Sequence, residues 1–446
     1  MRDILLVSIV IPAALAALRR PWIGVMLWTW LSIMNPHRYT YGFAYGAPLA
    51  AIAAGCTLLG LVFTREKQTP FQGVPIGFFA CLTAWITISW LMGIDVSGDY
   101  PQWSKVIKIY LMTFVALSVL SSKAHIMFFA CVTAGSLAFL GSKGGVFTIL
   151  SGGNYRVWGP PGSFIEDNNH FAVALIMTIP LLYFIQLQLT KRWMRLLTTV
   201  VMLLCIASAL GSHSRGGLLA IAAMGSLFWW RSKNKITIGV MAIVLVLFAL
   251  PMMPESWWSR MDTISTYDQD ASVIGRFNGW HVAFEVAKHH FFGGGMSYQH
   301  QIFFTLYGLY NTDIIAAHSI YFQILGNHGF VGLGIYLLMW FFTYSSAGWL
   351  RKNARLVPQA SWAADLGAMM QVSLVGYAVG GAFLSLPYFD LPYNIMVMVV
   401  LARKWVERRA WEKDPGSKVL DSFGFKGLAP PAGAAPETPS PKQRRA

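Results

Sequence analysis

The sequence predicts an all-α polytopic membrane protein with about 12 transmembrane helices. Hydrophobic residues make up 55% of the 446 residues and charged residues only 12%, whereas a soluble domain carries about 25% charged residues. Apolar runs of roughly 15 to 20 residues recur along the chain, close to the length that crosses a bilayer. Because no water satisfies backbone groups inside a bilayer, we expect these runs to be helices.

The candidate spans cover most of the chain, and the first two are short enough to form one hairpin that does not fully cross. Residues 4–18 are followed at once by Arg19-Arg20-Pro21-Trp22 and more apolar sequence, which favours a retained anchor or a re-entrant half-helix over a cleaved signal peptide. The candidate spans are residues 4–18, 22–34, 47–64, 73–92, 105–121, 124–141, 168–188, 195–211, 217–231, 236–252, 325–348, 363–386 and 391–407.

The basic residues predict the orientation. One set of alternate connections, with the C-terminal tail, holds 24 of the 34 Lys and Arg residues, and the opposite set holds 10. Positive residues stay in the cytoplasm, so the richer set is expected there. This bias explains most of the net charge of +15 without a nucleic-acid partner. The cysteines all lie in apolar runs, as small hydrophobic residues rather than disulfide or zinc ligands, at Cys56, Cys81, Cys131 and Cys205.

We expect four parts. An N-terminal transmembrane bundle covers residues 1–252, a large external loop covers 253–324, further transmembrane helices cover 325–410, and a disordered cytoplasmic tail covers 411–446. Within the loop, residues 277–291 have helical potential, Gly293-Gly294-Gly295 breaks the chain, and a second helix is expected to start near Asp313 and run into the next span.

Two arginines on the external side are candidates for binding an anion. Arg215 lies in residues 211–217, Gly-Ser-His-Ser-Arg-Gly-Gly, at the end of a span. An arginine at membrane depth is usually functional, although it can also snorkel to lipid head groups. Arg276 lies where the external helix is expected to begin, with Asn278 beside it. Either these groups form an anion site, or Arg276 is a solvated arginine at the start of a helix without a ligand.

His318 is the candidate for proton transfer. It precedes Tyr321 by three residues and Leu325 by seven, so the spacing predicts one shared helical face. A histidine on an apolar face is often structural, but this one lies at the membrane boundary, where proton transfer is plausible. His289, His290 and His328 are weaker alternatives.

Other external residues are candidate substrate contacts. Arg156 and Asn168 flank a Pro- and Gly-rich connection. Asp390 lies between two spans, where it orients a histidine, pairs with an arginine or forms a turn beside Pro392. Asp268-Gln269-Asp270 is a weak match to a metal-binding Asp-x-Asp pair, because two nearby acids arise easily by chance. These residues therefore predict neither a metal nor another cofactor.

The order of these motifs resembles a known family. Ser-Arg-Gly-Gly ends a span at 214–217, Gly-Arg lies in the large loop at 275–276, and His-Ser-x-Tyr-x-Gln-x-Leu-Gly-x-x-Gly-x-x-Gly follows at 318–332. This order resembles the O-antigen ligase family (WaaL type), whose superfamily also holds Wzy-type polymerases and protein O-oligosaccharyltransferases. The chain is most similar to the exosortase-associated O-glycosylation ligases, up to about Arg409. Ser319 stands where the family typically has Asn.

The resemblance implies a GT-C-like glycosyltransferase in the bacterial inner membrane, with its active site facing the periplasm. It implies transfer of a glycan from undecaprenyl diphosphate to a hydroxyl of the lipid A-core, in lipopolysaccharide assembly, with Arg215, Arg276 and His318 as catalytic residues. Arginines can stabilise a leaving diphosphate without a metal, and a histidine can take the hydroxyl proton, so we expect direct, inverting displacement. A Wzy-type polymerase or a protein O-oligosaccharyltransferase would need the same groups. A transporter would require charges in mid-span and internal symmetry, and the chain has little of either.

Overall fold

The structure is a computed structural model that describes residues 1–231, 234–237, 239, 240, 247, 255, 258, 271–309, 314, 316–413 and 417–426. Helices dominate these residues, and the described residues contain no strand beyond an isolated bridge between Leu189 and Phe425. The candidate span 236–252 and the acidic pair at 268–270 lie largely or wholly outside the described residues.

The helices of the N-terminal part are α1 (Arg2–Arg19), α2 (Pro21–Met34), η1 (Pro36–Tyr39), α3 (Leu49–Phe63), α4 (Val74–Leu91), α5 (Val96–Val119), α6 (Lys123–Leu150), α7 (Asn168–Gln188), α8 (Arg192–Gly211) and α9 (Arg215–Arg231). Those that follow are α12 (Ala271–His289), α13 (Gln301–Tyr307), α14 (Ile320–Asn353), η3 (Ala354–Leu356), η4 (Pro358–Ala360), α15 (Ser361–Gly381), α16 (Asp390–Glu407), η5 (Ala410–Glu412) and α17 (Ser417–Ser422).

Apolar runs located the helices well, since each candidate span within the described residues coincides with a helix. Among the described residues, five helices are long and apolar enough to cross a membrane: α4, α6, α7, α8 and α14. The chain is thus an all-helical protein with several membrane-spanning helices, and the total of about 12 spans stays a prediction.

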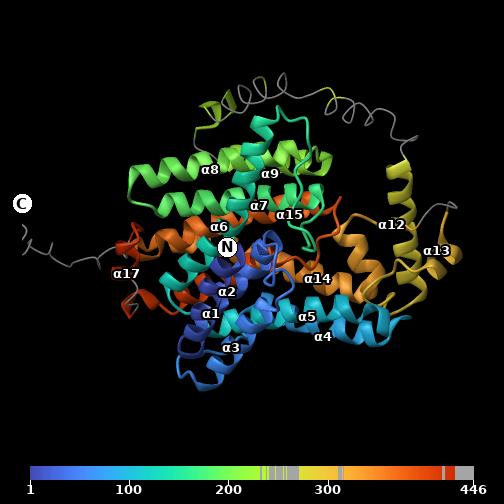
Figure 1. The fold of residues 1–446 in the computed structure, drawn as a ribbon, viewed down its shortest axis with the longest axis horizontal. Coiled ribbons are helices and arrows are strands. Elements are labelled where there is room, and N and C mark those ends of the chain that lie inside the picture. The colour runs from blue at the N-terminus through green and yellow to red at the C-terminus, as the bar shows by residue number, and fades with distance from the viewer. Residues whose placement is uncertain are drawn as a thin grey trace, which may run out of the picture.

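Most of the long helices run side by side, and α12 lies across one end of the bundle (Figure 1). The opposite end carries α17. α16 forms the centre, because every residue from Asp390 to Ala402 is buried. The end that carries α12 also holds the loop from α6 to α7 and the start of α14, and it is called the site end below.

α14 is broken, which the continuous apolar pattern over 325–348 does not predict. Gly329 has φ +68° and ψ −175° inside the helix. The Gly293–Gly295 turn packs into this break: the N–H groups of Gly294 and Gly295 donate to the carbonyls of Gly326 and Asn327, at 2.8 and 3.0 Å. A side chain at these glycines would meet backbone atoms, so the break depends on close contact between two backbones.

The prediction of a disordered tail from residue 411 is wrong for residues 417–426, which fold against the turn between α7 and α8. The N–H of Lys426 donates to the carbonyl of Gln188 at 2.8 Å, and the N–H of Thr190 donates to that of Gly424 at 2.9 Å. Leu420 and Phe425 are buried there. Composition predicted disorder because residues rich in Pro, Ala and Gly surround this short apolar segment. The helices that bury it are distant in sequence, so its burial is visible only in the structure.

Candidate functional site

His318 does not lie on a helix. The predicted helix from Asp313 through His318 is wrong for the described residues 316–319, since α14 begins only at Ile320. His318 has φ +44°, a left-handed conformation that is unfavourable for a residue with a side chain. Its ring therefore does not share the helical face of Tyr321 and Leu325.

Two aromatic side chains hold the backbone just before His318. The N–H of Ala317 donates to the Tyr298 hydroxyl at 2.8 Å, and the carbonyl of Ala317 accepts from the Trp280 indole N–H at 2.6 Å. Tyr298 and Ala317 are each only 1% exposed, so these bonds are shielded from water. Together they can maintain the strained conformation of His318, and we call Tyr298 and Trp280 the Ala317 clamp.

Charged groups surround the His318 ring. Burial lowers the pKa of His318 below the usual value of about 6.5, and the nearby Arg276 charge lowers it further, while Asp167 acts in the opposite direction. Within the described residues, the His318 ring makes no hydrogen bond. A half-buried, neutral imidazole with available nitrogens can accept a proton.

His170, at the start of α7, lies beside His318, with ring centroids 6.5 Å apart. Its Nε2 accepts from the backbone N–H of Ser385 at 3.2 Å, and Phe164 provides a backbone hydrogen bond. Both contacts hold the His170 ring in place beside His318. Asp167 caps the same helix by accepting from the N–H groups of Asn169 and His170.

Arg215 begins α9 after a tight turn from α8. In this turn His213 has φ +56°, and its Nε2 lies 2.9 Å from the Gly153 carbonyl. The buried Asn168 donates from Nδ2 to the carbonyl of Ser212 at 2.6 Å. Since Asn168 follows Asp167, these contacts connect the Arg215 turn, through the start of α7, to the surroundings of His318. Arg215 thus lies at the site end, as do Arg276 and His318.

Three further predicted residues lie near the site and differ in the contacts they make. Asn278 is fully buried and accepts from the N–H of Leu309 at 2.8 Å, and Tyr321 donates to the carbonyl of Ala378 at 2.8 Å, so both fasten the chain around the site. Arg156 is exposed on the loop whose Val157 N–H donates to the Gly211 carbonyl, next to the Arg215 turn.

Asp390 belongs to a different cavity, between α2, α5 and the loop at 162–165. It is 5% exposed and accepts from the Ser32 hydroxyl at 2.6 Å. Lys105 lines the same cavity, and its ammonium nitrogen lies 3.8 Å from the centre of the Phe164 ring. The structure therefore groups Asp390 with Ser32 and Lys105, and none of the three predicted catalytic residues lines this cavity.

The structure also distinguishes the four candidate histidines. His328 is fully buried, and its ring nitrogens lie 2.8 Å from the Ser89 hydroxyl and 2.7 Å from that of Tyr388, which fixes it beside the break in α14. His289 contacts the carbonyl of Glu285, and His290 lies 3.5 Å from the Tyr307 hydroxyl. Of the four, only His318 has a ring without hydrogen bonds in the described part of the chain.

Sequence reasoning did not single out Asp167, His170, Tyr298 or Trp280. The connection before α7 was noted for its Pro and Gly residues. A cap of the form Asp-x-x-His was a usable signal for Asp167 and His170. No sequence signal shows that Tyr298 and Trp280 converge on Ala317.

Comparison with known families relates two segments of the chain to family models. Residues 200–337 match the model of a family described as O-antigen ligase, and residues 1–190 match a family of unknown function. This match supports membership of the O-antigen ligase family, as the order of the motifs predicted. This segment contains Arg215, Arg276 and His318, together with the Ala317 clamp. No curated protein matches the chain.

The O-antigen ligase family consists of glycosyltransferase-like membrane enzymes, both ligases and polymerases. The membrane-spanning helices of this chain and the family segment together identify it as a membrane enzyme of that broad type. The segment runs from within α8 to within α14, so it includes the Arg215 turn, α12 and the residues before α14.

Proposed function

We propose that this O-antigen ligase family member transfers a glycan from undecaprenyl diphosphate to a hydroxyl of a lipid A-core acceptor, on the periplasmic face of the bacterial inner membrane. The observation that carries the proposal is the state of His318. Its backbone is fixed by the Ala317 clamp, its ring makes no hydrogen bond within the described residues, and Arg276 acts on it.

His318 is the general base in this proposal. The acceptor hydroxyl loses its proton to the imidazole as its oxygen attacks the anomeric carbon of the donor sugar. The bond from that carbon to the diphosphate oxygen breaks, and the electron pair leaves with the lipid diphosphate. Because burial and Arg276 keep His318 neutral, its ring can accept the proton near neutral pH.

Arg215 and Arg276 bind the diphosphate and stabilise the charge that develops on it. Guanidinium groups suit this role, because each can donate two parallel hydrogen bonds to phosphate oxygens and remains charged. Their two positive charges are sufficient to stabilise the leaving diphosphate without a metal ion. A single displacement then inverts the anomeric carbon. The side chains of Asn168 and Asn278 support this arrangement by hydrogen bonds to backbone groups, and Arg156 contributes from the neighbouring loop.

Purified protein incubated with undecaprenyl-diphosphate glycan and lipid A-core, in the presence of EDTA, tests the proposal. We expect ligated product, with activity lost in His318→Ala, Arg215→Ala and Arg276→Ala. His289→Ala is the matched histidine control, and Lys288→Ala is the matched basic control; both side chains are exposed on α12. Activity that survives in His318→Ala would overturn the assignment of the base.

The acceptor can be tested in the same reaction. A polymerase would join the glycan to a second polyprenyl-linked glycan, and a protein O-oligosaccharyltransferase would need a protein hydroxyl. Product found only on one of these acceptors would identify that activity in place of the ligase activity. The proposed roles of His318 and the two arginines would be unchanged.

A further inference from the structure

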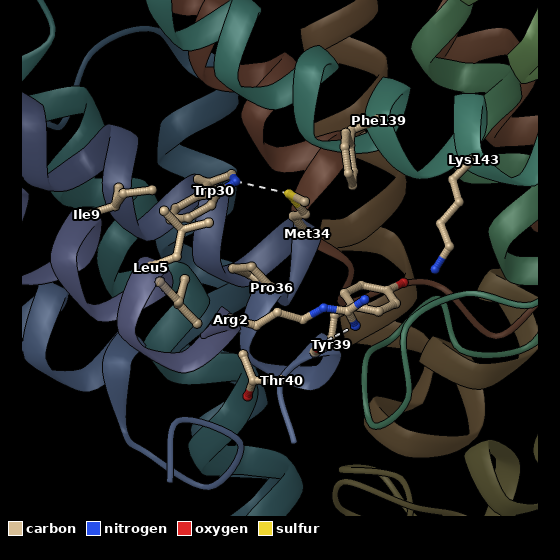
Figure 2. Close-up of a pocket in the computed structure, with 11 residues that line it drawn as sticks. Arg2, Leu5, Ile9, Trp30, Met34, Pro36, Tyr39, Thr40, Phe139 and Lys143 are labelled. Carbon is tan, nitrogen blue, oxygen red and sulfur yellow. Dashed lines mark hydrogen bonds between the residues drawn. The ribbon is translucent and has the colours of Figure 1, made fainter. Parts of the chain in front are cut away.

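A groove separate from the candidate active site lies between α1, α2, η1 and α6. Figure 2 shows apolar side chains of α1 and α2 on one side, and a cluster of Arg2, Tyr39 and Lys143 on the other. The cavity measures about 360 Å³, within the roughly 300–1,000 Å³ of small-molecule sites. None of Arg215, Arg276 and His318 lines it.

The groove is amphipathic along its length. Leu5 and Ile9 of α1 are 64% and 49% exposed, and Phe139 of α6 is 57% exposed. Exposed apolar side chains of this kind are compatible with contact to lipid chains on a helix in a bilayer. What distinguishes this stretch is that it ends at two cations.

The two cations are held at the head of the groove, and both contact Tyr39, Arg2 through its carbonyl and Lys143 through its ring. The Arg2 guanidinium donates to the Tyr39 carbonyl at 3.3 Å and lies 5.3 Å from the centre of the Tyr41 ring. The Lys143 ammonium nitrogen lies 4.6 Å from the centre of the Tyr39 ring. These residues are far apart in sequence, yet Figure 2 shows them converging.

Among the residues that the structure describes, no acid lines the groove to neutralise them. The nearest acid in sequence is Asp3, and its Oδ1 accepts from the backbone N–H groups of Gly42 and Ala44 at 3.1 and 3.0 Å. Asp3 is therefore engaged with the loop after η1. The head of the groove keeps two positive charges and has room beside them for an anion.

The position along the bundle fits a lipid head group. Lys143 lies in the last third of α6, which leads into the loop at 151–167 and so into the start of α7 beside His318. The cations thus lie toward the site end of the bundle, and the apolar wall extends from them along α1 toward its middle.

We infer that the groove binds one anionic diacyl phospholipid, with its phosphate between Arg2 and Lys143 and one acyl chain along Leu5, Ile9 and Phe139. Two cations with no acidic neighbour select a net negative head group over a zwitterionic one. A single snorkelling side chain would instead accept any head group, without an accompanying apolar wall. Because none of the three catalytic candidates lines this groove, we assign the lipid as a bound structural component and not as the glycan donor. It would join the α1–α2 hairpin to α6.

Binding can be measured by native mass spectrometry of delipidated protein in detergent. The probes are phosphatidylglycerol and phosphatidylethanolamine with identical acyl chains. We expect one phosphatidylglycerol to bind at least tenfold more tightly than phosphatidylethanolamine and to raise the thermal unfolding temperature. In the Arg2→Gln, Lys143→Gln double variant, affinity for phosphatidylglycerol should fall roughly tenfold or more, toward that for phosphatidylethanolamine.

Two further variants separate charge from shape. Leu5→Trp fills the groove from an exposed position and should displace the lipid with both cations retained, whereas Lys288→Gln removes an exposed charge elsewhere at the site end and should change nothing. Equal binding of the two lipids, or wild-type binding in the double variant, would show general snorkelling and overturn the inference. Displacement of phosphatidylglycerol by undecaprenyl diphosphate would also overturn it, by assigning the groove to the donor.

Discussion

The Ala317 clamp offers the sharpest test of how the fold prepares His318. Tyr298→Phe removes the hydroxyl that accepts the Ala317 N–H at 2.8 Å and leaves the buried ring in place. The buried N–H then lacks a partner, which costs about 1–3 kcal/mol. The left-handed backbone of His318 is itself unfavourable by about 1–2 kcal/mol, so the backbone has a reason to relax when the bond is lost.

If this energy biases His318 away from its reactive position, kcat should fall roughly 5- to 150-fold, because about 1.4 kcal/mol corresponds to a factor of ten. KM for the lipid donor should change little, since Arg215 and Arg276 are intact. Steady-state transfer kinetics, with a thermal unfolding scan to show that the variant is folded, measure both quantities.

Tyr307→Phe is the matched control, because the Tyr307 hydroxyl lies 3.5 Å from His290 and does not contact Ala317. Trp280→Phe removes the other bond of the clamp and should lower kcat in the same way. Wild-type kcat in a folded Tyr298→Phe variant would refute the positioning role of the clamp. An equal loss in Tyr307→Phe would mean that any change near α13 has this effect.

Three other outcomes follow from the structure. The transfer rate should rise with pH as His318 loses its proton, with a midpoint below about 6.5, and Arg276→Gln should move that midpoint upward, because the positive charge that disfavours protonation is gone; a pH–rate profile of the residual activity measures this. Gly329→Ala should lower the thermal unfolding temperature, since φ is +68° and an added Cβ would lie 2.4 Å from the Phe291 carbonyl, while Gly334→Ala, with open space around it, should not. Leu420→Asp should release residues 417–426 from the bundle, detected as faster proteolysis of the tail than in Val419→Asp, because Leu420 is fully buried and Val419 is 48% exposed.

The sequence was sufficient to locate the helices within the described residues. Long apolar runs such as 168–188 must be helical in a bilayer wherever they pack, so their positions follow from local composition. The motif order at Arg215, Arg276 and His318 was sufficient to indicate a family, and the family match over residues 200–337 confirms it. Their roles in catalysis remain predictions.

What only the tertiary structure decided is how those residues are held. His318 and His328 lie ten residues apart near one apolar segment, yet the ring of His318 makes no hydrogen bond within the described residues, whereas both ring nitrogens of His328 are bonded. The difference arises from partners far away in sequence: Trp280 and Tyr298 for the backbone before His318, Ser89 and Tyr388 for His328. Hydrogen-bond satisfaction and burial depend on which surfaces meet, and a linear pattern does not contain that information.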